Sequence, residues 1–146
     1  MATTTAAVTL SSDLLSGSLS VTGSSTFMKA GTTADGLNQM RMGRNEIPTG
    51  TTFDLFNATA AGVDKANKVY IANLSTDNTY FVVITIKAKV IGRLYGGDWM
   101  FLPWNMDDVT QDIVVTANTG TNTIEWVKFH ENETLLTEDQ ATGASA

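Results

Sequence analysis

Apolar and polar residues alternate along much of the chain with the period of two that half-buried β-strands show. The longest such stretch runs from Thr79 to Ile91, where every even-numbered position is apolar or aromatic. Its odd-numbered positions begin apolar with Phe81 and have become polar by Lys87. This pattern predicts one long strand, buried on both faces at its start and on one face at its end. We expect its core-facing positions to be Val82, Ile84, Ile86 and Val90, with Lys87 and Lys89 facing solvent or a subunit boundary.

Shorter stretches predict further strands, and turn-forming residues separate them. These stretches cover residues 53–56, 68–74, 99–104, 112–117 and 122–129. The run Asn-Thr-Gly-Thr that follows Ala117 predicts a hairpin with Gly120 at positive φ. Several short strands at this spacing indicate an all-β fold, which we predict to be a single β-sandwich or jelly-roll domain.

The predicted domain covers residues 35–130, and the two ends of the chain differ from it in composition. Residues 1–34 are rich in Thr, Ser, Ala and Gly and nearly free of charge, with apolar positions spaced among them. They predict an extended N-terminal arm, or edge strands laid on another surface. Residues 131–146 form an acidic tail of small residues. At the start of the domain, glycines and a proline punctuate residues 35–48, which favours a short helix or an ordered loop there.

Composition supports the all-β prediction and argues against several classes of function. Charged residues make up 16% of the chain, and Thr, Ser, Asn and Gly, which suit strands and turns, take their place. The formal net charge is -6, and no stretch gathers the Lys and Arg that a nucleic-acid-binding surface requires. The chain has no cysteine, which excludes disulfides and thiolate chemistry. No apolar run reaches the length of a membrane helix or a signal segment, so we do not expect a membrane as a partner. The acidic net charge leads us to expect no nucleic-acid partner either.

The candidate catalytic and metal-binding residues form no recognisable motif. The only histidine, His130, ends the last predicted strand without a nucleophile motif nearby, so we expect an exposed side chain. Four carboxylates surround the tryptophan-rich stretch: Asp98, Asp107, Asp108 and Asp112. They could stabilise turns, bind Ca²⁺ or act as an acid–base pair. Turn chemistry explains them better, because they stand beside glycines or in a polar loop. We predict no catalytic residue, no cofactor and no metal ion.

Two groups of apolar residues are candidates for a subunit interface. Trp, Met and Phe, which are enriched at interface cores, crowd residues 99–104, although an all-apolar strand is also typical of a domain core. The N-terminal arm carries a valine and leucines that are too apolar for open water, separated by residues whose backbone groups need partners. We expect this arm to lie across a neighbouring subunit or a partner protein. The candidate interface residues are Val8, Leu10, Leu14, Leu15, Leu19, Trp99, Met100, Phe101 and Trp104.

A series of segments between Lys68 and Phe129 adds a further expectation: K-V-Y-I-A-N-L, then G-R-L-Y-G-G-D-W-M-F-L-P-W, then D-I-V-V-T-A and T-I-E-W-V. The series covers less than half of the chain and resembles small virion structural proteins of tailed bacteriophages, of the capsid decoration (cement) type. The resemblance implies a β-sandwich or jelly-roll subunit that assembles as a symmetric homo-oligomer, often a trimer. It also implies a place on the capsid surface, with the major capsid protein or other virion proteins as partners, after synthesis in the host cytoplasm. It assigns no functional residue.

The sequence leaves functions from different classes open. The leading hypothesis is a non-enzymatic decoration protein that binds and stabilises the lattice of the major capsid protein. The alternative is a carbohydrate- or receptor-binding module of a phage fibre or another virion appendage, because aromatic side chains line sugar sites and Trp99, Trp104 and Trp126 have carboxylates nearby. A small hydrolase is the third, although no motif supports it.

Overall fold

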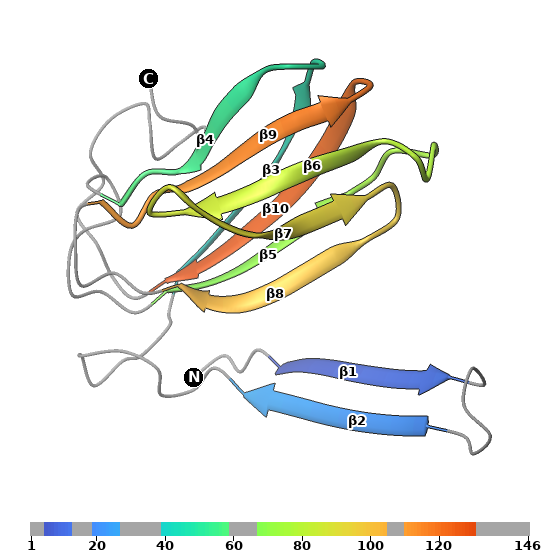
Figure 1. The fold of residues 1–146 in the computed structure, drawn as a ribbon. Helices are drawn as coiled ribbons and strands as arrows, with labels where there is room; N and C mark the ends of the chain where they lie inside the picture. Colours follow the sequence, from blue (N-terminus) through green and yellow to red (C-terminus); the bar gives the residue numbers. More distant parts are fainter. Residues whose placement is uncertain (1–4, 13–18, 27–38, 59–66, 105–109, 131–146) are drawn as a thin grey trace.

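The computed structural model describes residues 5–12, 19–26, 39–58, 67–104 and 110–130, and these residues form ten β-strands (Figure 1). The predicted all-β class is confirmed. The strands are β1 Thr5–Ser12, β2 Leu19–Thr26, β3 Gln39–Ile47, β4 Thr52–Phe56, β5 Asn67–Asn73, β6 Phe81–Ile86, β7 Lys89–Tyr95, β8 Trp99–Trp104, β9 Ile113–Thr119 and β10 Asn122–His130.

The strands β3 to β10 form two four-stranded sheets, with the orders β3-β10-β5-β8 and β4-β9-β6-β7. Every neighbouring pair is antiparallel. Along the chain, each connection except that between β6 and β7 passes from one sheet to the other, as Figure 1 shows. Eight antiparallel strands divided in this order are a jelly roll, which confirms the predicted β-sandwich or jelly-roll domain.

The core lies between the inner faces of the two sheets. Every second residue of β10, from Asn122 to His130, is buried, and β9 alternates in the same way from Ile113 to Ala117. Such alternation is expected when one face of a strand meets a core and the other does not. The largest apolar side chains that are almost completely buried are Trp126, Ile47, Leu55, Ile71, Ile84, Ile113 and Ile124.

The predicted long strand from Thr79 to Ile91 is wrong, because the chain turns back in its middle. Ile86 pairs with Lys89, so Lys87 and Ala88 form a two-residue hairpin loop between β6 and β7. Both loop residues have positive φ, 51° and 58°, as a type I′ turn requires. The turn was not predicted because such turns strongly prefer Asn-Gly or Asp-Gly, not Lys-Ala.

The hairpin changes which side chains of this stretch reach the core. Val82 and Ile84 are buried as predicted, and Ile86 is half-buried against the core. Val90, predicted to face the core, is 66% exposed, because it follows the turn and pairs with Thr85 on the outer face. Val90 and the neighbouring Ile91 therefore stand at the surface of an edge strand.

The expected helix or loop before Pro48 is also wrong for its described residues, which form β3. Residues 39–47 pair with β10 along their whole length, with Gly43 opposite Trp126. The pattern hid this strand because its inner positions 41, 43 and 45 are polar or small, while Met40 and Met42 lie on the outer face. A Cβ on Gly43 would lie 2.6 Å from Cζ2 of Trp126, so the large indole occupies the room that a small inner residue leaves. Residues 35–38 lie outside the described residues.

The turn between β9 and β10 has the predicted glycine conformation but a different topology. Gly120 has a φ of +66°, as expected. The two strands that it joins belong to different sheets, so the turn is a crossing between sheets and the predicted hairpin is wrong. A Cβ on Gly120 would collide with the ring of Tyr80, a second reason why this position suits glycine.

The N-terminal strands form a separate two-stranded antiparallel sheet, which Figure 1 draws outside the sandwich. Val8 stands opposite Gly23, and Leu10 opposite Val21. The described residues of the arm are therefore a β-hairpin. The candidate interface residues Leu14 and Leu15, and the acidic tail 131–146, lie outside the described residues.

Candidate protein-interaction surface

The outer face of the sheet β3-β10-β5-β8 is apolar across all four strands. The strand pairing places Met42, Val127, Tyr70 and Phe101 in one row, because Val127 faces both Met42 and Tyr70, and Tyr70 faces Phe101. In the next row, Phe129 stands between Met40 and Lys68. We call this surface the apolar outer face and define it by Met40, Met42, Tyr70, Trp99, Phe101, Val127 and Phe129.

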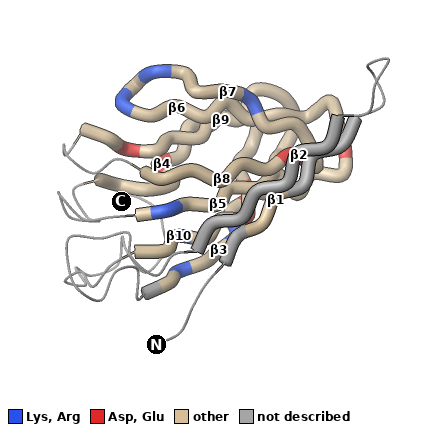
Figure 2. The backbone as a smooth tube through the Cα atoms, turned by 90° about the horizontal axis from the view of Figure 1, so that it is seen from below, with Lys and Arg blue, Asp and Glu red and all other residues tan. Residues whose placement is uncertain are grey.

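Large parts of the apolar outer face are open to solvent. Met40 is 56%, Met42 62% and Trp99 48% exposed. Figure 2 views the molecule from below, and the tube of β8, the edge strand of this sheet, carries no charged residue. Contiguous apolar surface of this kind is uncommon on a monomeric protein, which makes this face a candidate site of interaction.

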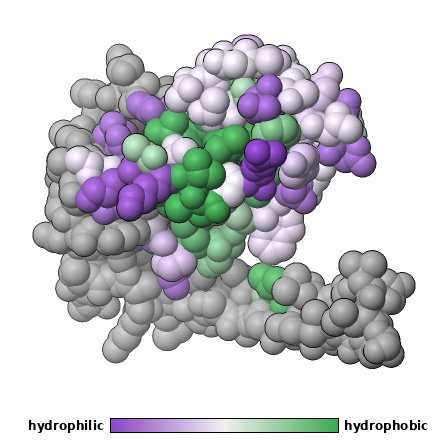
Figure 3. All heavy atoms as spheres, in the orientation of Figure 1, coloured by the Kyte–Doolittle hydropathy of each residue, from purple (hydrophilic) through white to green (hydrophobic). Residues whose placement is uncertain are grey.

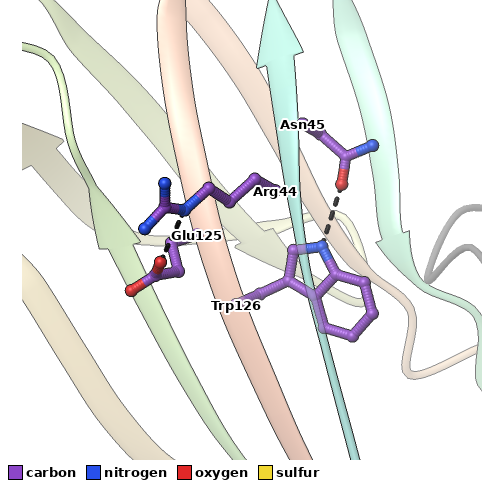
Figure 4. Close-up of polar contacts among 4 residues, drawn as sticks. All are labelled: Arg44, Asn45, Glu125 and Trp126. Carbon is purple, nitrogen blue, oxygen red and sulfur yellow. Dashed lines mark hydrogen bonds and ion pairs between the residues drawn. The ribbon is translucent and has the colours of Figure 1, made fainter.

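A charged pair borders the apolar outer face at one end. The guanidinium Nε of Arg44 donates a hydrogen bond to Oε2 of Glu125 across β3 and β10, at 2.7 Å (Figure 4). The next residues of the same strands point to the other side of the sheet, where Nε1 of Trp126 donates to Oδ1 of Asn45 at 2.9 Å. An apolar centre with a polar, partly exposed border is the usual composition of a protein–protein interface.

The opposite end of the face is aromatic and hollow. The rings of Tyr70 and Trp99 lie 6.1 Å apart between centroids, with 34° between their planes. Together with Phe101 they line an open hollow of about 250 Å³, whose remaining wall is formed by Ala7 and Val8 of β1. The N-terminal hairpin thus approaches the apolar outer face, and it leaves a space there that no described side chain fills.

The structure separates the predicted interface residues into different groups. Trp99 and Phe101 lie on the apolar outer face, and Val8 faces them across the hollow. Trp104 is a correction: it is 3% exposed and belongs to the core, where its Nε1 donates to the carbonyl oxygen of Gln111 at 2.7 Å. Met100 is partly buried and packs against the same core. Leu10 and Leu19 lie in β1 and β2.

Five of the seven residues of the apolar outer face, Tyr70 among them, were missed at the level of sequence. Met40 and Met42 were assigned to a helix or loop, and Val127 and Phe129 to a strand without a role at the surface. A short period-two signal was present at Met40, Arg41 and Met42, but both methionines lie on the outer face, and the outer positions that follow are charged. Only the pairing of β3 with β10 brings the methionines beside Tyr70 and Phe101.

A second group of exposed apolar side chains lies on the other sheet. Val90 and Ile91 are 66% and 53% exposed on the edge strand β7. Figure 3 shows apolar side chains gathered over the β6–β7 hairpin. This patch is smaller than the apolar outer face and contains no aromatic residue.

Asp98 and Asp112, which stood as candidates for chemistry, accept hydrogen bonds from backbone N–H groups. Oδ2 of Asp98 accepts a hydrogen bond from the backbone N–H of Tyr95 at 2.9 Å. Oδ1 of Asp112 accepts one from the backbone N–H of Ala58 at 2.7 Å. The side-chain hydroxyl and the backbone N–H of Thr79 both donate to Asp77, and they lower the pKa of that carboxyl group. The contacts of Asp77 and Asp98 are local turn contacts, whereas that of Asp112 reaches a residue 54 positions away. Asp107 and Asp108 lie outside the described residues.

His130 is not the exposed side chain that was predicted. It is 1% exposed, because the strand alternation of β10 places it on the inner face of the sheet with Trp126 and Lys128. Among the described residues, no three His, Cys, Asp or Glu side chains come together in a group that could hold a metal ion. The described part of the chain also contains no helix with the length and apolar character to span a membrane.

Comparisons with known proteins add little to this picture. Neither family models nor curated protein sequences give a match to the chain. Among solved structures, it is similar to the crystal structure of a cupin protein from Bacteroides fragilis, with 18% identity over 70% of this chain and 78% of that chain, and a TM-score of 0.37. A likeness this distant carries no argument about function, and the jelly-roll assignment rests on the strand order.

Proposed function

We propose that this chain is a non-enzymatic structural protein of a tailed-phage virion, a decoration protein that binds and stabilises the lattice of the major capsid protein. The observation that carries the proposal is the apolar outer face, which spans all four strands of one sheet and is largely uncovered at Met40, Met42 and Trp99. A surface of this composition needs a protein partner, because leaving it in water costs about 25 cal/mol for each Å² of apolar area.

The resemblance of the segments from Lys68 to Phe129 to virion decoration proteins supports the choice of partner. The architecture agrees with this choice, since jelly rolls are common in capsid proteins, although they are also common in lectins and cupins. The non-enzymatic part of the proposal draws on the backbone contacts of Asp98 and Asp112 and on the inward position of His130. These side chains have structural partners or lie in the interior.

Purified particles test this proposal. Virions of the phage that encodes the chain are separated on a density gradient and analysed by mass spectrometry, and particles lacking the chain are compared by cryo-electron microscopy. We expect the chain in the particle fraction, as a regular layer on the capsid that is absent from the deletion particles, which should also lose their contents at a lower temperature. Presence of the chain in the lysate alone, or only on the tail, would contradict the proposal.

A second candidate function is carbohydrate binding by a virion appendage, and the aromatic end of the apolar outer face favours it. Trp99 is half exposed beside Tyr70, and such aromatic platforms stack on sugar rings. Trp104 no longer supports this candidate because it lies in the core. A glycan array separates the two functions: specific sugar binding that is lost in Trp99→Ala and kept in Tyr95→Ala, an exposed aromatic of the other sheet, would favour the appendage.

A further inference from the structure

We infer that Lys128 and Asn67 are joined by an isopeptide bond between their side chains, which links the neighbouring strands β10 and β5. The inference concerns the chain's own covalent structure and does not depend on the proposed place on the capsid. It begins with burial, because Lys128 is 5% exposed and Asn67 is 3% exposed. Lysine is rarely buried to this degree, and here it lies on a strand beside a buried carboxamide.

The strand register places the two side chains within reach of each other. His130 stands opposite Asn67, and Lys128 stands opposite Val69, so Lys128 and Asn67 are diagonal neighbours on adjacent strands. Both belong to the buried set of their alternating strands, which is the inner face of the sheet. Diagonal neighbours on one face lie about 7–8 Å apart, within reach of a long side chain. The flexible four-carbon stem of lysine is such a side chain.

The surroundings of Lys128 favour a nucleophilic amine. Trp126, two residues earlier on the same face, is buried, and so is Val69 on the neighbouring strand. On the other side, Arg41 of β3 stands opposite Lys128. Apolar neighbours and a nearby positive charge both favour the uncharged form of an amine, which is the form that attacks a carbonyl carbon.

The reaction needs only the two side chains and a proton carrier. Nζ of Lys128 attacks Cγ of Asn67 and forms the new C–N bond, and the bond from Cγ to Nδ2 breaks. Nδ2 leaves with the electron pair and one proton as ammonia, while Nζ gives up one proton. His130, opposite Asn67 and two residues after Lys128 on the same face, is placed to carry that proton. The fold holds amine and carboxamide together, and this proximity makes an otherwise stable carboxamide reactive.

The bond gives the sandwich a covalent link that a disulfide cannot supply, because the chain has no cysteine. It joins β10 to β5, the two central strands of their sheet. A cross-link between distant positions of a chain restricts the unfolded state, as a disulfide does. The linked chain should therefore unfold at a higher temperature than the chain with Lys128→Met.

Mass spectrometry of the denatured full-length chain tests the bond. The intact mass should be lower than the sequence mass by one molecule of ammonia. Trypsin should leave the chain uncut after position 128, and the digest should contain a branched peptide that joins positions 67 and 128. Lys128→Met should restore the full sequence mass of the variant. Lys68→Met is the matched control: this lysine adjoins Asn67 but stands opposite Phe129 on the other face, so the loss of ammonia should remain.

The unaltered chain decides the outcome even if a variant folds poorly. A full sequence mass overturns the inference, and so does a loss of ammonia without the branched peptide. The role of His130 has its own measurement, the rate at which the linked form appears after cell-free synthesis. His130→Gln should slow this step about a hundredfold or more, and an unchanged rate would overturn the proton-carrying role. None of these results bears on the particle test of the proposed function.

Discussion

The indole of Trp126 lies directly against Gly43, so close that a β-carbon on Gly43 would stand 2.6 Å from Cζ2 of the ring. The ring cannot easily move away. Its Nε1 donates to Asn45, and the ring of Phe56 meets it edge-on, with centroids 5.4 Å apart. The pairing of β3 with β10 therefore depends on a residue without a side chain at this position.

Gly43→Ala should for this reason lower the free energy of unfolding by about 1–3 kcal/mol, the usual cost of overpacking a core. Urea denaturation followed by the fluorescence of the buried tryptophans measures the change. Gly92→Ala is the matched control, because a Cβ at Gly92 would meet nothing within 4 Å and its backbone needs no positive φ. Equal stability of the two variants would show that Trp126 is not held against Gly43.

Asn73 connects three strands at the end of the sandwich. Its buried side-chain amide donates to the carbonyl oxygen of Leu94 at 3.0 Å and to Oδ1 of Asn122 at 2.8 Å, and its Oδ1 accepts from the backbone N–H of Ser75. Asn73→Ala should lower the free energy of unfolding by about 2–4 kcal/mol, since each buried polar group that loses its partner costs about 1–3 kcal/mol. Asn118→Ala, at an exposed position near the end of β9, should change it by less than about 0.5 kcal/mol. A neutral Asn73→Ala would contradict the bonded network.

The turn between β6 and β7 contains a backbone conformation that its residues disfavour. Lys87 and Ala88 both have positive φ, which costs a residue with a side chain roughly 1–2 kcal/mol. Ala88→Gly should therefore stabilise the protein by about 0.5–1 kcal/mol, after the greater entropy of glycine in the unfolded chain is subtracted. Thermal unfolding followed by circular dichroism measures the gain.

The reverse substitution provides the control for this turn. Gly97 has a φ of +93° and open space where a Cβ would lie, so Gly97→Ala isolates the cost of the backbone conformation. It should destabilise by about 1 kcal/mol. If Ala88→Gly destabilises as well, the turn does not have positive φ at Ala88, and the original prediction of a continuous strand would regain support.

The sequence was informative wherever apolar residues face inward in regular alternation. Val82, Ile84 and Ile124 follow that rule, and the strands that contain them were predicted. The sequence was misleading where the local turn residues and the strand pairing disagree. The run Asn-Thr-Gly-Thr at 118–121 suggested a hairpin but joins strands of different sheets. The hairpin between β6 and β7 is instead closed by Lys87 and Ala88. Local residues favour a turn conformation, but which strands pair is decided by long-range contacts.

The interaction surface was only partly predictable for a related reason. Trp99 and Phe101 stood out as large aromatic residues. Trp104 is also a large aromatic residue of the same strand, yet it lies in the core. Alternation within β8 separates them, but the sequence could not tell which set faces inward. Met40 and Met42 join the surface only through the strand order of the sheet.

The most direct test of the central claim is oxidative footprinting of the apolar outer face in the assembled particle and in dilute monomeric chain. Hydroxyl radicals oxidise accessible Met and Trp side chains, and mass spectrometry gives the rate at each position. Oxidation of Met40, Met42 and Trp99 should fall several-fold on assembly, relative to the exposed Tyr95 of the other sheet. Oxidation of these three side chains at the same rate in both states would show that the apolar outer face stays open, and would contradict the claim that it is the interaction surface.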